Sequence, residues 1–567
     1  MLSKFENDVV IVLAGEAGQG IQSIEGILSL LLKRSGYNYF STSEFMSRVR
    51  GGVNSTEIRI SSQEVNGFRN RIDILIPLSD KSVDHLKSRL TDQTLVIGEK
   101  DKTTYKKSIE VPFSDIAKEI GNKIFSNTVA AGFICGLLNV ELQLCKDFIA
   151  EYFASKKQDI IDKNIIAISK GHKIGKDLEQ IKITIDKSKK IQKHLLLTGA
   201  EAVSLGALAG GCNFVCAYPM SPATSVLENM ASYSKDNDII VEQVEDEIGV
   251  INMTLGAWYA GARAMATTSG GGFALMSEGI SLCAMIESPL VMHIAQRPGP
   301  ATGLPTRTEQ GDLNLVLYAG HGDFPRIILA PGTLEEAFYQ SRNAFNMSAK
   351  YQMPVFILTD QFFVDSKYNI ENFDLDNFEI EESIVKTNPD YQRFAFTKDG
   401  LSPRGIPNHG KGLVCVDSDE HDESGHITED FDIRVKMVDK RKHKLKLVEK
   451  DITPPKLIGK ENYKTLVICW GSTFNTLKEA LEELENEDIS LLHFSWIYPL
   501  HKDTFDYLNK ADKTIIVENN SSGQMAQLIR STTGFAIDEE ILKYNGLPFS
   551  VEELKQKITN LINKEKK

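Results

Sequence analysis

The sequence lacks long hydrophobic runs and any excess of basic residues. No apolar stretch approaches the ~18 residues that span a membrane, and the polar start Met1–Asp8 is unlike a signal peptide. Lys and Arg number 64 against 77 Asp and Glu, so the net charge is −13. A non-specific nucleic-acid binder needs a basic surface. We therefore expect a cytoplasmic protein that binds neither membranes nor nucleic acids.

Cysteine is also scarce. Seven cysteines are scattered through 567 residues, and the closest pair is Cys212 and Cys216. An iron–sulfur cluster needs four clustered thiolates, and no such group occurs in the sequence. We therefore predict no metal site on this chain and expect its cysteines to be small buried apolar residues.

The residues that are present indicate a multidomain α/β protein. The composition, 42% hydrophobic and 25% charged, is typical of soluble globular proteins, and the length suffices for three or four domains. Residues 1–180 form the first predicted domain, doubly wound with a Rossmann-like opening. Its expected elements are a strand at 9–14, a glycine turn at 15–20, a helix at 21–32, a second βα step at 45–52, and strands at 72–76 and 94–97.

A lysine-rich linker is predicted at 181–194, followed by a second domain at 195–365. Helical stretches separate six short apolar runs in this domain, which predicts a mostly parallel sheet covered on both faces. The predicted strands are Phe214–Ala217, Ile239–Val241, Ala264–Thr268, Leu290–Ala295, Ile327–Leu329 and Val355–Leu358.

Residues 366–460 interrupt the α/β alternation and are predicted to connect two domains. They carry an acidic run at Asp417–Glu423 and a basic helical pattern at Arg434–Lys446. We expect both to be solvated surface that could contact each other. Residues 461–567 return to strand–turn–helix patterns and predict a small C-terminal α/β domain.

The glycine turn at residues 15–20 has the spacing G-x-x-G-x-G. A turn before a helix can hold a phosphate, but dinucleotide sites use G-x-G-x-x-G. The spacing therefore favours a structural turn, or a loop against a partner subunit, over a nicotinamide site.

A second group of polar residues follows two predicted strands. Ser221 lies in the proline-bracketed turn Tyr218–Thr224, and an acid cluster ends at Glu247 just before a helix of small residues. Open α/β sheets bind ligands at the carboxyl ends of their strands. The acids could bind a ligand or simply supply negative charge to a helix N-terminus. Glu247 fits a ligand contact best, with Glu245 and Glu242 as alternatives.

These motifs, in this order, resemble the alpha subunits of the 2-oxoacid:ferredoxin oxidoreductases, most closely the 2-oxoglutarate type. The N-terminal block resembles the gamma subunit of the same family, so the resemblance covers nearly the whole chain. The matching segments are Tyr218–Thr224, the acids up to Glu247, Thr267–Phe273, Gln296–Thr306, Gly322–Arg326, Ser402–Pro407, Glu420–Glu423, Gly425–Ile427, Val517–Asn520, Gly523–Gln524, Gly15–Gly20 and Arg50–Gly52.

The resemblance implies a gamma-like domain, a thiamine-diphosphate pyrimidine-type domain and a transketolase-C-like domain. It implies oxidative decarboxylation of a 2-oxoacid to acyl-CoA and CO2, with electrons passed to ferredoxin. Mg2+, a 4Fe-4S cluster and the diphosphate-binding motif would belong to a separate beta subunit in an (alpha–beta)2 assembly. The chain itself has neither the diphosphate motif nor a cysteine cluster, so we expect it to need that partner.

The resemblance also implies roles for individual residues. Glu247 would contact N1′ of the thiamine aminopyrimidine, Arg297 would bind the substrate carboxylate, and Ser221 would hydrogen-bond substrate or cofactor. The implied cofactor contacts further include Tyr218, Pro219, Ser269, Gly270, Gly271, Gly272 and Phe273, and the implied substrate contacts include Thr302 and Gly303.

One departure concerns the substrate. The family usually has Ile-Thr-Pro where this chain has Met220-Ser221-Pro222, which keeps the hydroxyl and loses a methyl group. Three alternatives remain at the level of sequence: the same machinery acting on pyruvate, a branched-chain or an aromatic 2-oxoacid; a nicotinamide-dependent dehydrogenase using the first block; and a non-catalytic assembly subunit.

Overall fold

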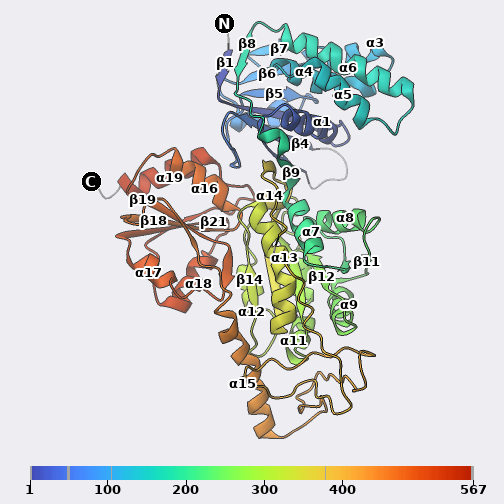
Figure 1. Ribbon diagram of the computed structural model, residues 1–567. Coiled ribbons are helices and arrows are strands. Elements are labelled where there is room, and N and C mark those ends of the chain that lie inside the picture. The colour runs from blue at the N-terminus through green and yellow to red at the C-terminus, as the bar shows by residue number, and fades with distance from the viewer. Residues whose placement is uncertain (1–2, 47–51, 104, 377, 564–567) are drawn as a thin grey trace. The chain divides into compact units, whose positions relative to one another are not determined.

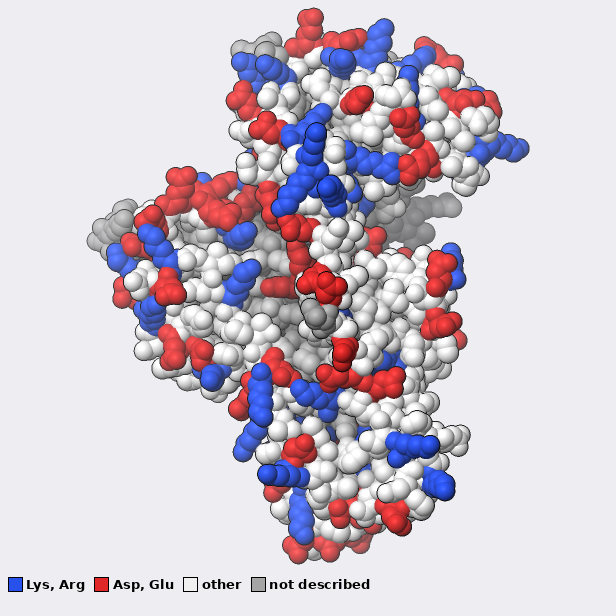
Figure 2. Space-filling model, in the orientation of Figure 1, with Lys and Arg blue, Asp and Glu red and all other residues white. Residues whose placement is uncertain are grey.

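A computed structural model describes residues 3–46, 52–103, 105–376 and 378–563. The chain divides into two compact units (Figure 1). Unit 1 comprises residues 1–198, 365–373 and 550–553, and unit 2 comprises residues 199–364, 374–549 and 554–567. No helix in the described part of the chain is long and apolar enough to cross a membrane. Figure 2 shows acidic and basic side chains intermixed on the visible faces of the units.

Unit 1 is built on an eight-stranded mixed sheet of order β7-β6-β5-β2-β4-β3-β16-β9. Its central strand, β2, is the predicted apolar run, and seven of its nine residues are buried. The helix α1 follows the glycine turn as predicted. The strands are β1 (Ser3–Glu6), β2 (Asp8–Glu16), β3 (Asn38–Glu44), β4 (Val53–Ser61), β5 (Ile74–Pro77), β6 (Leu95–Gly98), β7 (Ser108–Glu110), β8 (Ile181–Thr184), β9 (Leu195–Thr198) and β16 (Lys367–Ile370).

The second predicted βα step, at 45–52, is wrong. Strands β3 and β4 pair with each other antiparallel, and β4 also pairs antiparallel with β2. Residues 47–51 lie outside the described part of the chain. The sequence misled because β4 (Val53–Ser61, VNSTEIRIS) has six polar residues out of nine, although eight of the nine are buried.

The helices of unit 1 gather mainly on one face of the sheet (Figure 1). They are α1 (Ile21–Arg34), α2 (Ser82–His85), α3 (Phe113–Ile120), α4 (Ser126–Leu137), α5 (Leu142–Tyr152) and α6 (Gln158–Lys176). Helices α4 and α6 cross closely because glycines line their contact. A Cβ atom on Gly171 would lie 2.0 Å from the Val129 carbonyl oxygen, and one on Gly136 would lie 2.2 Å from that of His172.

The boundary between the units differs from the predicted linker at 181–194. Strand β8 (Ile181–Thr184) lies inside that segment and pairs in parallel with β1. Strand β9 (Leu195–Thr198), expected in the second domain, belongs to the sheet of unit 1. Strand β16 joins the same sheet between β3 and β9. These pairings join segments far apart in sequence, so no local pattern could reveal them.

Unit 2 contains the predicted parallel sheet. Its order is β11-β10-β12-β13-β15-β14-β20, and all but β20 run parallel. The six predicted strands all occur. They are β10 (Phe214–Ala217), β11 (Ile240–Gln243), β12 (Ala264–Thr268), β13 (Leu290–Gln296), β14 (Ile327–Leu329) and β15 (Pro354–Asp360), with β20 (Trp496–Tyr498) added at one edge.

Helices cover this sheet, with α7, α8 and α13 packing together and α9, α10 and α11 sharing a core with the strands (Figure 1). The bounds are α7 (Gly199–Ala209), α8 (Thr224–Tyr233), α9 (Glu247–Tyr259), α10 (Gly270–Leu275), α11 (Ser277–Met285), α12 (Leu313–Tyr318), α13 (Leu334–Tyr351) and α14 (Gln361–Asp365).

The connecting segment ends in helix α15 (Phe431–Val448), the predicted basic helix. Its expected exposure is wrong in part, because Lys440, Arg441 and Lys444 are buried. Lys440 and Lys444 both pair with the buried carboxylate of Glu287. The predicted contact with the acidic run is confirmed, since Glu420 pairs with Arg441 at 2.8 Å. The buried partner, Glu287, lies about 150 residues away in sequence, so the helix pattern alone could not reveal it.

The C-terminal α/β region has a five-stranded sheet of order β17-β19-β18-β21-β22, in which β17 alone runs antiparallel. Its elements are β17 (Lys456–Ile458), β18 (Thr465–Trp470), α16 (Thr473–Glu482), β19 (Ile489–Phe494), α17 (Thr504–Asn509), β21 (Lys513–Glu518), α18 (Gln524–Thr533), β22 (Glu539–Leu542) and α19 (Val551–Asn563). The α/β class predicted for every domain is confirmed.

Candidate functional site

The predicted site residues follow four neighbouring parallel strands of unit 2. In the sheet order β11-β10-β12-β13, the strands are followed by Glu247, Ser221, the Ser269–Phe273 loop and Arg297 respectively. Carboxyl ends of parallel strands meet at one edge of a sheet, where such folds bind ligands. The fold therefore brings these four segments to one edge.

Glu247 is the buried member of the acid cluster. It is the first residue of α9 and is 3% exposed, whereas Glu242 and Glu245 are exposed. The preceding Asp246 has a φ of 68° and caps the helix by accepting a hydrogen bond from the Gly249 amide at 2.8 Å. The Oε1 atom of Glu247 is buried without a hydrogen-bond partner. Buried polar atoms are normally paired, so this oxygen is available to accept or share a hydrogen bond with a bound ligand.

The glycine run packs against carboxyl groups on two sides. A Cβ atom on Gly272 would lie 2.6 Å from Oε1 of Glu247, and one on Gly270 would lie 2.2 Å from Oδ2 of Asp312. Gly271 is exposed, and a Cβ atom there would meet no other atom closer than 3.8 Å. Glycine at 270 and 272 therefore lets the backbone approach both acids closely.

Arg297 extends from the end of β13 toward the Ser221 turn. Its Nη1 atom donates a hydrogen bond to the Ser221 carbonyl oxygen at 2.6 Å, and its Nε atom is buried without a partner. Burial lowers the pKa of Arg297 and the charge of Asp312 partly opposes this. A guanidinium remains charged near neutral pH, so Arg297 presents a cation at the site.

Two acids of the site were missed in the sequence. Asp312 has its Oδ2 atom buried without a partner, and burial raises its pKa to about 6 against the lowering effect of Arg297. Burial, followed by the charge of Asp312, raises the pKa of Glu309 to about 7. Perturbed acids cluster at functional sites. Both lie in a polar loop, where single acids carry no pattern that distinguishes them.

The remaining predicted residues are placed differently. Phe273 is fully buried and packs edge-on against Phe356 at 5.5 Å, so its ring belongs to the core. Tyr218 is partly buried against the same core. Thr302 and Gly303 are exposed on the loop after Arg297, and within the described residues no hydrogen bond joins them to Glu247, Ser221 or Arg297.

The glycine turn of unit 1 and the rest of the chain give less indication of a binding site. In the Gly15–Gly20 turn, the Glu16 amide donates to Oε1 of Gln19 at 2.8 Å, which closes the turn on itself. Arg50 and Gly51 lie outside the described residues. Among those that are described, no group of three or more His, Cys, Asp or Glu side chains could hold a metal ion.

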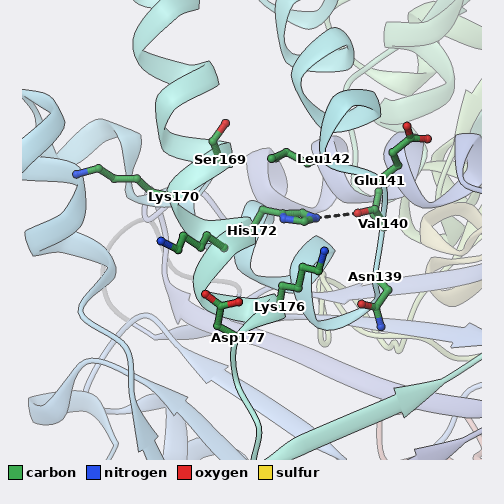
Figure 3. Close-up of a pocket in the computed structure, with 10 residues that line it drawn as sticks. Asn139, Val140, Glu141, Leu142, Ser169, Lys170, His172, Lys176 and Asp177 are labelled. Carbon is green, nitrogen blue, oxygen red and sulfur yellow. Dashed lines mark hydrogen bonds between the residues drawn. The ribbon is translucent and has the colours of Figure 1, made fainter.

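A cavity of about 670 Å³ lies in unit 1, beside α5 and α6 (Figure 3). The His172 ring is hydrogen-bonded at the side of the cavity, where the Nε2 atom of the ring lies 2.7 Å from the Val140 carbonyl oxygen. Lys170 points away, and its Nζ atom pairs with Glu119. Neither of these two basic groups therefore offers a free charge to a ligand in the cavity.

The unit 2 site lies within a known family segment. Residues 205–440 match the family model described as "Pyruvate flavodoxin/ferredoxin oxidoreductase, thiamine diP-bdg", and residues 10–174 match "Pyruvate ferredoxin/flavodoxin oxidoreductase". A 2-oxoacid:ferredoxin oxidoreductase subunit alpha from Sulfolobus sp is 32% identical over 97% of this chain and 96% of its own length. The chain belongs to this family of alpha subunits.

Two further relatives carry narrower names. A 2-oxoglutarate synthase subunit KorA from Archaeoglobus fulgidus is 31% identical over 59% of this chain and 89% of its own length. The structure of 2-oxoglutarate:ferredoxin oxidoreductase from Magnetococcus marinus, with 2-oxoglutarate, coenzyme A and succinyl-CoA bound, matches with a TM-score of 0.91. It is 28% identical and covers 98% of this chain and all of its own. The present alpha subunit is thus part of an oxidoreductase with ferredoxin as acceptor.

Proposed function

We propose that this alpha subunit holds the aminopyrimidine of thiamine diphosphate at Glu247 and acts in the oxidative decarboxylation of 2-oxoglutarate to its acyl-CoA. The observation that carries the proposal is the buried, unpartnered Oε1 of Glu247 beside Gly272. A carboxylic acid there can hydrogen-bond N1′ of the ring, and Gly272 lets the backbone pack closely against that carboxyl group. The residues present therefore fit the cofactor.

Thiamine diphosphate supplies the carbon nucleophile when it is bound. With the cofactor bound, Glu247 would hydrogen-bond N1′ and exchange a proton with it, as a general acid–base does. Its burial in the first turn of α9 excludes water from that proton. Thr268, whose hydroxyl also lies against Gly272, helps to fix the space around the carboxyl group.

Arg297 is the proposed partner of the substrate carboxylate. A guanidinium can bind a carboxylate through two parallel hydrogen bonds, and Nε of Arg297 has no protein partner. Ser221 is anchored through its carbonyl oxygen to Arg297, which leaves its hydroxyl for substrate or cofactor. Thr302 and Gly303, on the loop after Arg297, are proposed to contact the substrate as well.

Two relatives support 2-oxoglutarate as the substrate. One is named a 2-oxoglutarate synthase subunit, and the solved structure contains 2-oxoglutarate, coenzyme A and succinyl-CoA. Coenzyme A is accordingly proposed as co-substrate here. Pyruvate, branched-chain or aromatic 2-oxoacids would use the same Glu247 and Arg297, so substrate comparison must accompany any assay.

The remaining cofactors are assigned to a partner. The described residues of this chain offer no metal-binding group, and the sequence has no cysteine cluster. We propose that a beta subunit supplies Mg2+ and a 4Fe-4S cluster, that the pair assembles as (alpha–beta)2, and that ferredoxin takes the electrons. The N-terminal unit is proposed to be a fused gamma-like domain.

The test is 2-oxoglutarate-dependent and coenzyme A-dependent reduction of a viologen dye by the chain co-expressed anaerobically with its beta subunit. We expect activity with the pair and none with this chain alone. Pyruvate in a parallel assay identifies the preferred acid. A well-formed complex that reduces no dye with any 2-oxoacid would favour the non-catalytic assembly subunit.

A further inference from the structure

Asp312 lies near Arg297, the residue proposed to bind the substrate carboxylate. Its carboxyl group lies over Gly270, with Oδ1, Oδ2 and Cγ all within 2.4 Å of where a Cβ atom would stand. Its backbone amide donates to Oε1 of Gln296 at 3.0 Å, which fixes the residue next to Arg297. The site thus contains two acids, Glu247 and Asp312, that lie against opposite ends of one glycine run, each with a buried oxygen that lacks a partner.

Asp312 and Arg297 are close enough to interact but do not pair. The charge of Arg297 acts to lower the pKa of Asp312, yet the described residues contain no ion pair or hydrogen bond between the two. Oδ2 of Asp312 and Nε of Arg297 are each buried without a partner. Each side chain therefore keeps one polar atom that a ligand group could pair with, while Nη1 of Arg297 already donates to the Ser221 carbonyl oxygen.

We propose that Asp312 is a positioning residue that competes with the substrate carboxylate for Arg297, so that a 2-oxoacid binds when Asp312 carries its proton. This inference rests on the proposed function of Arg297. An ionised Asp312 repels the incoming carboxylate and attracts the guanidinium. A protonated Asp312 does neither, and its hydroxyl can donate to the bound carboxylate.

The other charged groups near Asp312 support this assignment. Glu309, on the same loop, has its pKa raised to about 7 by burial and then by the charge of Asp312, so it takes up its proton before Asp312 does as the pH falls. The glycine run has no ionisable side chain. From α18, Gln524 contributes an amide that bonds the Gly311 carbonyl oxygen at 2.8 Å. Arg297 is therefore the cation facing Asp312. The experiment must distinguish the titration of Glu309 from that of Asp312.

Asp312 has a pKa of about 6, so the effect falls in an accessible range. The experiment measures KM and kcat for 2-oxoglutarate from pH 5.5 to 8.5 in the complete alpha–beta complex, comparing wild type, Asp312→Asn and Glu309→Gln. In wild type, we expect KM to rise about tenfold per pH unit above about pH 6 while kcat stays level. Asp312→Asn should keep a low KM that no longer rises with pH, whereas Glu309→Gln should retain the slope.

Other outcomes would contradict either the role of Asp312 or the proposed function. A flat KM profile in wild type overturns the inference without reference to any variant, so misfolding of Asp312→Asn cannot hide a failure. A slope that persists in Asp312→Asn, or that Glu309→Gln alone removes, also overturns it. Absence of 2-oxoacid-dependent dye reduction by wild type at every pH would instead count against the proposed function.

Discussion

Three glutamates within six residues differ in burial, and this separates Glu247 from Glu242 and Glu245. Glu242 and Glu245 face solvent, whereas Glu247 is buried with an unpartnered oxygen. Replacing Glu247 by Gln should lower kcat by about 10²-fold or more, because an amide cannot exchange a proton with the ring. The same change should slow hydrogen–deuterium exchange at thiamine C2, measured by NMR after acid quench.

Glu245→Gln is the matched control, since it removes a carboxylate of the same cluster from an exposed position. We expect it to exchange at the wild-type rate. Normal C2 exchange in Glu247→Gln, together with slow exchange in Glu245→Gln, would move the ring contact to Glu245.

Some of the individual residues of the candidate site could be predicted from the sequence. Ser221, the glycine run, Glu247 and Arg297 all follow apolar runs, so their common edge could be expected from strand direction alone. Asp312 and Glu309 could not, because Asp312 comes against Gly270 only when the loop after β13 folds back, and Glu309 is partly buried on the same loop. The choice of Glu247 over Glu245 likewise depends on where α9 begins.

Among the elements, α15 has two buried lysines that share a single buried carboxylate, Glu287. Burial would raise the pKa of Glu287, but Lys444, Lys440 and Arg393 outweigh it and lower the pKa. Replacing Glu287 by Gln leaves Lys440 and Lys444 buried without a counter-charge, which should cost about 3–5 kcal/mol. Hydrogen exchange across residues 431–448 would report the loosened helix.

Lys442, exposed on the same helix, provides the comparison. Lys442→Gln should change stability by no more than about 0.5 kcal/mol. Because the folded pKa of Glu287 is depressed, its contribution is present above the ordinary Glu pKa and is lost only as the pH falls through the folded value. Equal protection of α15 in wild type and Glu287→Gln would show that the lysines find other partners.

The close crossing of α4 and α6 predicts how glycine substitutions change the stability of unit 1. In Gly171→Ala, the new methyl group would meet the Val129 carbonyl oxygen at 2.0 Å, and two backbones would have to separate. We expect unit 1 to lose about 3 kcal/mol or more. Gly26→Ala in α1, where the nearest atom is 3.7 Å away, should instead stabilise by up to about 1 kcal/mol. Thermal unfolding of both variants tests the contrast.

At the scale of the whole molecule, helices and parallel strands were predictable, but long-range pairings were not. The six predicted strands of the parallel sheet in unit 2 are marked by short apolar runs between helical stretches. Strand β16 (Lys367–Ile370) is short and partly polar, and its partners lie in β3 and β9. Nothing local to it distinguishes it from a loop, so the predicted domain limits missed its place in unit 1.

This arrangement predicts how the chain can be divided. A fragment of residues 1–198 would lack β16, which leaves the backbone edge of β3 (Asn38–Glu44) unpaired and β9 unattached. Exposed strand edges promote aggregation. We expect that fragment to aggregate in size-exclusion chromatography, whereas a version with residues 365–373 joined by a flexible linker stays monomeric. A monodisperse 1–198 fragment would contradict the expectation.

The interleaving of β16 also matters during synthesis on the ribosome. The first 198 residues emerge long before residue 370, and their sheet cannot be completed until the strands of unit 2 up to β15 have followed. At roughly 5–20 residues per second, the edge of β3 waits about ten seconds or more for its neighbour. The nascent N-terminal unit therefore passes through an interval in which a chaperone, or another nascent copy, can reach an edge that the finished protein covers.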